Sequence, residues 1–129
     1  MLSIKDLLKQ LDSDITNTRK CAIIWELGNM GPEAEKASSK LGKILLKDTD
    51  WRRRSFAAWA LGRIGGKKAQ KSLEKVIKQK NLDEIILYGA QWSLHWLKVR
   101  LTCIKTDGPC TLEELKAIAK ENPEIMMDL

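Results

Sequence analysis

Several features that define whole protein classes are scarce in this sequence. The 129 residues include three cysteines (Cys21, Cys103 and Cys110), an odd number without zinc-site spacing, so neither a disulfide framework nor a structural zinc site is expected. The longest apolar runs, such as residues 21–25, are far too short to cross a bilayer, and the first residues do not open a signal peptide. We therefore expect a soluble, cytoplasmic protein without a membrane span.

Residues that carry enzyme chemistry are equally few. The single histidine, His95, lies between Leu94 and Trp96 with no obvious Cys or Ser partner, which favours a packing role over that of a general base. The sequence contains no phosphate-binding loop, no cluster of metal ligands and no Gly-x-Ser-x-Gly motif. We expect no catalytic residue, no metal and no cofactor.

The sequence does contain an internal repeat. Residues 25–31 match residues 59–65, which lie 34 positions later, with a tryptophan, a leucine, both glycines and one apolar position in common. A weaker third copy begins at Trp92, where His95 and Lys98 replace the two glycines. The second halves of the first two units also align, at an offset of 32, so each unit is predicted to be a pair of helices.

Hydrophobic periodicity and capping residues place these helices. Residues 53–64 put their apolar side chains within about 140° of arc, as an amphipathic helix does. Ser3, Thr16, Asp50 and Asp83 are the predicted N-caps, and glycines at 31 and 65–66 mark the turns between paired helices. The predicted helices span residues 3–11, 16–30, 33–47, 51–64, 67–80, 83–101 and 111–121.

A two-helix unit of this length cannot bury its own apolar stripe, so neighbouring units must stack and share one core. The expected fold is a single all-α domain over residues 1–129, a short right-handed α-solenoid of about three helical hairpins. Its parts are an N-terminal helix (1–12), repeats at about 13–47, 48–80 and 81–121, and a tail (122–129). The third unit has a longer connection, which is typical of a terminal repeat.

Over about residues 12–101 the units resemble HEAT repeats of the short type found in phycobilisome lyases. The second unit matches the family pattern of an acidic cap, arginine, small residues, Leu-Gly and a final glycine at Asp50, Arg54, Ala57, Ala58, Leu61, Gly62, Ile64 and Gly65. Arg19 and Arg53 stand where the family usually has valine, and the third unit lacks both glycines. The resemblance implies the HEAT fold and specifies almost nothing about activity.

Positive charge is concentrated in the middle of the chain. Residues 33–80 contain fourteen Lys and Arg against five Asp and Glu, whereas residues 106–129 contain two against six. Parallel stacking would place the lysines of two second helices side by side, forming a field that attracts anions; these are Lys36, Lys40, Lys43, Lys68 and Lys75. The alternative is an ordinary solvated helix face.

Tryptophan recurs at the same place in three units, at Trp25, Trp59 and Trp92. These side chains lie about 130° from the centre of the apolar arc, so they either form an exposed ladder or close a seam between helices. Tryptophan and arginine are typical of binding hot spots, and Arg52 and Arg54 join them as candidate contacts. Glu26 and Arg53 fall on inward arcs, and we expect Glu26 to form an inter-repeat bond with Arg53 or Arg54.

These features favour a non-enzymatic adaptor. Its basic helix face and tryptophan flank would bind a partner protein with an acidic surface, through long-range attraction and aromatic burial. Binding of a nucleic-acid backbone is the first alternative, and it would depend steeply on salt. The family resemblance suggests an accessory role in a tetrapyrrole lyase as a second alternative, and self-association is a third.

Overall fold

The computed structural model describes the backbone of residues 2–105 and the side chains of residues 2–98. Every regular element in this part of the chain is a helix. The elements are α1 (Ile4–Leu11), α2 (Asn17–Met30), the 3₁₀ helix η1 (Gly31–Ala37), α3 (Ser38–Lys47), α4 (Trp51–Ile64), α5 (Lys67–Val76) and α6 (Glu84–Lys105).

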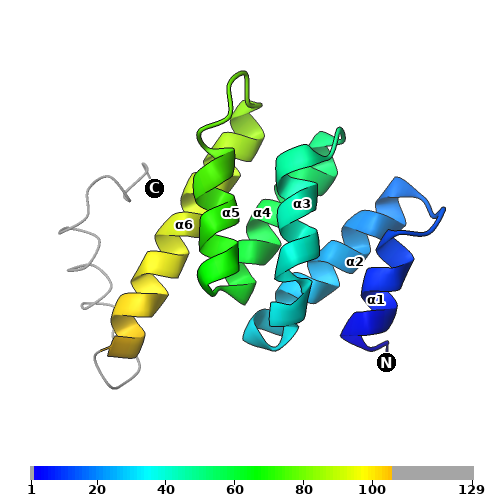
Figure 1. Ribbon diagram of the computed structural model, residues 1–129, viewed down its shortest axis with the longest axis horizontal. Coiled ribbons are helices and arrows are strands. Elements are labelled where there is room, and N and C mark those ends of the chain that lie inside the picture. The colour runs from blue at the N-terminus through cyan, green and yellow to red at the C-terminus, as the bar shows by residue number, and fades with distance from the viewer. Residues whose placement is uncertain (1, 106–129) are drawn as a thin grey trace.

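The helices pack in two layers (Figure 1). Helices α2, α4 and α6 lie side by side in the first layer, and α1, η1 with α3, and α5 form the second layer. The pairs α2 with α3 and α4 with α5 are the first two predicted hairpins. The fold is therefore the short all-α solenoid that the repeat predicts.

The helix starts follow from local capping chemistry. Ser3 and Asp6 form a reciprocal capping box at α1, and the Thr16 side chain accepts a hydrogen bond from the Arg19 N–H at α2. At α4, Asp50 accepts hydrogen bonds from two backbone N–H groups. Asp83 accepts one from the Ile85 N–H at the start of α6, so all four predicted caps are confirmed.

Three helix boundaries differ from the prediction. The segment predicted as one helix over 33–47 is broken near Ala34, whose φ and ψ are −91° and 22°. Ala34 and Ala37 are fully buried there, and η1 packs against α1, α2 and α4, so tertiary contacts override the helical period. Helix α6 extends to Lys105, and the helix predicted over 111–121 lies outside the described residues.

Helix α5 ends at Val76 instead of continuing to residue 80. The Gln79 side chain turns back and donates to the Leu46 carbonyl oxygen at 2.9 Å, and Asn81 has a positive φ of 58°. These interactions redirect the chain before α6. The hydrophobic pattern did not reveal them because Ile77 still fits the apolar period of α5.

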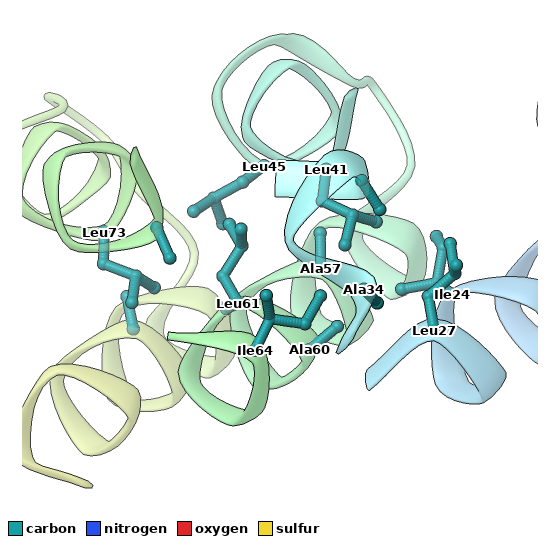
Figure 2. Close-up of a cluster of buried hydrophobic side chains, with 14 of the residues drawn as sticks. Ile24, Leu27, Ala34, Leu41, Leu45, Ala57, Ala60, Leu61, Ile64 and Leu73 are labelled. Carbon is teal, nitrogen blue, oxygen red and sulfur yellow. The ribbon is translucent and has the colours of Figure 1, made fainter. Parts of the chain in front are cut away.

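One apolar spine runs between the layers. Leu27, Leu41, Leu61 and Leu73 have no exposed surface, and Figure 2 shows them pointing from both layers into a common interior. The alanines of α4 fill the narrower gaps between these leucines. A shared core of this kind explains why one repeat alone would leave its stripe exposed.

Neighbouring repeats approach each other closely at glycines. A Cβ added to Gly62 would lie 2.6 Å from the Cβ of Ser93, and one added to Gly28 would lie 3.0 Å from the Cα of Ala60. In the second layer, a Cβ on Gly42 would lie 2.5 Å from the Ser72 Oγ. These contacts fix how closely the helices of consecutive repeats pack.

We expect Gly62→Ala to lower the free energy of unfolding by up to about 2 kcal/mol. Overpacking against Ser93 costs about 1–3 kcal/mol, and the better helix propensity of alanine returns only about 1 kcal/mol. The control is Gly89→Ala, whose new Cβ would meet Ala58 at an ordinary 4.0 Å. Urea unfolding should show Gly89→Ala unchanged or stabilised; equal stability of both variants would contradict the close packing at Gly62.

Candidate functional site

The outward surface of the first layer carries a row of tryptophans. The rings of Trp25 and Trp59 stack nearly parallel, with centroids 6.2 Å apart and an interplanar angle of 9°. Trp59 lies over Gly28 of the preceding repeat, while Trp25 remains half exposed. The row therefore closes a seam between helices and also leaves flat apolar surface open.

A hollow of about 510 Å³ continues this row between α4 and α6. The rings of Trp59, Trp92 and Trp96 line it, together with Arg63 and the turn at Gly31 and Pro32. Trp92 and Trp96 meet edge to face with centroids 6.0 Å apart, and Trp96 is 43% exposed. Aromatic side chains from two consecutive repeats thus converge on one concave site.

Phe56 extends the aromatic surface towards α2. It lines a hollow of about 460 Å³ with Trp25, and a smaller one between Trp25 and Trp59. Phe56 falls on the apolar arc of its helix and packs against the core, but it is only partly buried. The equivalent residues in the first and third repeats, Ala22 and Gly89, are both small. This difference in size indicates that the Phe56 side chain projects farther from its helix than they do.

Two arginines accompany the tryptophans. The Arg63 guanidinium lies over the Trp59 ring at 5.7 Å, and that of Arg52 lies over the Trp51 ring at the same distance. Such cation–π contacts hold a positive charge against an apolar surface. Among residues 2–98, none of those that line the three hollows is acidic. We call this surface the tryptophan face, comprising Trp25, Phe56, Trp59, Arg63, Trp92 and Trp96.

The lysines lie on the second layer, away from the tryptophan face. Lys43 and Lys47 project from α3, and Lys68, Lys71 and Lys75 from α5. All five are exposed, and with Lys36 of η1 we call this surface the lysine face. Lys40, also predicted to belong to it, is only partly exposed and forms an ion pair with Asp12.

His95 and Cys21 lack the surroundings of reactive groups. Burial lowers the pKa of His95, which is 8% exposed between Trp92 and Trp96, so its imidazole is neutral at pH 7. Burial also raises the pKa of the Cys21 thiol. Within residues 2–98, no three His, Cys, Asp or Glu side chains gather where they could hold a metal ion. No helix in the described part of the chain is long and apolar enough to cross a bilayer.

The paired helices, their glycine contacts and the shared spine have a counterpart among known families. Residues 4–95 match the family described as HEAT repeats. The chain belongs to the HEAT repeat family. None of the curated proteins matches this sequence. HEAT repeats generally mediate protein–protein interactions, and the match says nothing finer about which surface does so.

In this HEAT repeat chain, Arg54 has a structural role. Its Nε donates to the Leu45 carbonyl oxygen at 2.8 Å, and its Nη2 donates to Gln79 at 2.6 Å. Gln79 in turn donates to the Leu46 carbonyl oxygen. The guanidinium therefore joins α4 to the end of α3 and to the turn after α5, and its contact with a partner stays a prediction.

The predicted bond between Glu26 and Arg53 is wrong. Arg53 donates two hydrogen bonds to Asp48, at 2.8 and 2.9 Å, and one to Asn17 of the preceding repeat at 3.1 Å. Glu26 is exposed. Its counterpart Ala60 faces Gly28, but no repeat in the described part of the chain packs against the corresponding side of α2, so Glu26 meets solvent there. An inter-repeat bond exists, and Asn17 accepts it.

We expect Asp48→Ala to lower the free energy of unfolding by about 1.5–3 kcal/mol, because it leaves a partly buried guanidinium without its main acceptor. Glu26→Ala is the control, and its effect should stay within about 0.5 kcal/mol. Urea unfolding of both variants tests the assignment. A larger loss in Glu26→Ala would restore the bond that the sequence suggested.

The contribution of Asp48 should also depend on pH. Burial acts to raise the pKa of this carboxyl, but hydrogen bonds from Arg53 and from the Asp50 N–H outweigh it and lower the pKa below its ordinary value. A carboxyl whose pKa is lowered by folding stabilises the folded state at any pH above its unfolded-state pKa of about 3.9. This stabilisation is lost as the pH falls through the lower folded-state pKa. The stability difference between wild type and Asp48→Asn should therefore be constant at neutral pH and shrink below about pH 4.

Proposed function

We propose that the chain is a non-catalytic adaptor whose tryptophan face binds a segment of a partner protein carrying both apolar and acidic side chains. Membership of the HEAT repeat family supports the general role, because these repeats commonly bind proteins. The observation that carries the specific proposal is the hollow between α4 and α6, where three indole rings and one guanidinium surround a single space.

The apolar part of the proposed partner follows from the aromatic surface. Trp25 and Trp96 are 50% and 43% exposed, so folding leaves about half of each indole in water. Covering such rings stabilises a complex strongly, because fully burying large aromatic side chains is worth several kcal/mol and tryptophan is typical of hot spots. The hollow gives a partner side chain somewhere to insert, which a flat surface would not.

The acidic part follows from charge. Arg63 lines the same hollow as three tryptophans, and Arg52 lines the neighbouring hollow beside Trp25. None of the described residues that line these hollows is a carboxylate, so the arginines give an acidic segment favourable charge there. Complementary charge of this kind accelerates encounter and disfavours basic partners.

The two-layer fold separates the tryptophan face from the lysine face. Tryptophans project from α2, α4 and α6, whereas the lysines project from η1, α3 and α5. A single short segment cannot contact both surfaces without wrapping around an edge of the stack. The adaptor role therefore rests on the tryptophan face alone.

Selection from a displayed library of random short peptides tests this proposal. We expect the enriched peptides to combine Asp or Glu with bulky apolar residues. Trp25→Ala and Trp96→Ala should each weaken binding of these peptides about tenfold, or ~1.4 kcal/mol, in a fluorescence anisotropy titration. Quenching or enhancement of the intrinsic tryptophan emission on binding gives a second, label-free readout.

Tyr88→Ala is the matched control. Tyr88 is 56% exposed, slightly more than Trp25, but it lines none of the three hollows. Peptide affinity should be the same in this variant as in wild type. Selected peptides rich in lysine, or an equal loss of affinity in all three variants, would show that the tryptophan face is not the peptide site.

A further inference from the structure

We propose that the lysine face is a second binding site, independent of the tryptophan face, and that its ligand is the phosphate backbone of a nucleic acid. The two faces belong to different helix layers and share no residue. Success or failure of either proposal therefore leaves the other open to its own test.

Contacts along α3 and α5 align the lysines of two repeats. Lys68 donates to the Ser39 Oγ at 3.4 Å near the start of the helices, and Gly42 faces Ser72 in the middle. Near the end, Gln79 donates to the Leu46 carbonyl oxygen. Matching contacts from start to end mean that the helices run parallel and side by side, as Figure 1 shows. Their lysines consequently form two adjacent rows.

These rows carry positive charge that the fold does not neutralise. Lys43, Lys47, Lys71 and Lys75 are exposed, and none of them pairs with a carboxylate within the described residues. Helices α3 and α5 carry a single carboxylate, Glu74, against their lysines. Asp12, at the end of α1, pairs with Lys40, and Glu33 and Glu35 lie on η1 beside Lys36. Uncompensated lysines attract a polyanion over a distance of about one Debye length, roughly 10 Å.

The chemistry of the face favours phosphates over a protein ligand. Its cations are all lysines, which bind phosphate as point charges, and it contains no aromatic ring of the kind that is enriched in protein–protein interfaces, where lysine is depleted. Lysines four residues apart, such as Lys43 and Lys47, are separated by about 6 Å along the helix axis. A regular row of charges suits a ligand that is itself a regular row of charges.

The same surface lacks what a membrane site needs. The large exposed apolar side chains of the described residues are Leu2, Trp25, Trp51, Ile85, Tyr88 and Trp96, and none of them belongs to α3 or α5. An interfacial helix inserts such side chains among lipid chains. The lysine face has only charge to offer, so we expect binding that follows the backbone and ignores base sequence.

Binding of a fluorescein-labelled DNA duplex of arbitrary sequence to the whole chain tests the proposal, at several salt concentrations. We expect micromolar affinity at low salt, with the logarithm of the binding constant falling linearly against the logarithm of salt concentration. Replacing Lys43 and Lys75 together by glutamine should reduce the slope by about 2, since each phosphate contact contributes about 0.9. Replacing both by arginine keeps the charge and should keep the slope.

Arg19→Gln with Arg52→Gln is the matched control, because it removes two exposed charges from the first layer. This control should leave the slope unchanged, and Trp25→Ala should leave duplex binding unchanged. Circular dichroism and urea unfolding verify that each variant is folded. The proposal is overturned if the duplex does not bind at low salt, or if the variant with Lys43→Gln and Lys75→Gln has the same slope as the variant with Arg19→Gln and Arg52→Gln. Tighter binding to polyglutamate or to phosphatidylserine vesicles than to the duplex would also overturn it.

Discussion

The close approach of consecutive repeats at glycine is the contact on which the rest of the structure depends. Gly28 and Gly62 let the small residues Ala60 and Ser93 pack directly against the backbone of the preceding helix, and Gly42 does the same for Ser72. Helices held this close bring side chains of successive repeats within reach of one another. The stacking of Trp25 on Trp59 and the convergence of aromatic rings at the hollow both follow from that spacing.

The two layers divide the chemistry of the molecule. The first layer presents indole rings with a few arginines, which suits contact with apolar and acidic side chains at short range. The second layer presents lysines with little apolar surface, which suits long-range attraction of anions. The hydrogen bonds of Arg53 join neighbouring repeats and those of Arg54 join neighbouring helices, so these arginines stabilise the stack.

The sequence predicted the fold better than the site, for reasons that particular residues make clear. Asp50 caps α4, and Gly65 and Gly66 adopt the positive φ values of 77° and 91° that a turn after the helix requires. Signals of this kind act over a few residues and can be read locally. The break at Ala34 and the turn at Gln79 depend on contacts with other helices, and periodicity cannot report those.

The same distinction explains the errors at individual side chains. The helical periodicity gives Glu26 and Ala60 equivalent positions in their two repeats. It does not show that only Ala60 has a preceding repeat to pack against. Likewise, Arg54 bonds to Leu45 and Gln79, which belong to other elements, so the basic residues next to it in the sequence do not indicate its partners. Phe56 packs against the core as its helix face predicts, and only its size relative to Ala22 indicates that part of the side chain stays outside.

Glu26 also bears on how the stack is terminated. At the equivalent positions Ala60 and Ser93 are small enough to pack against a glycine of the adjoining helix, whereas Glu26 places a solvated carboxylate there. A helix of a second copy docked on that side of α2 would bury this carboxylate, at a cost of several kcal/mol unless it met a positive charge. Glu26 therefore disfavours close packing of another unit at this edge of the first layer, and unwanted association of this kind is a hazard for any protein built from self-complementary units.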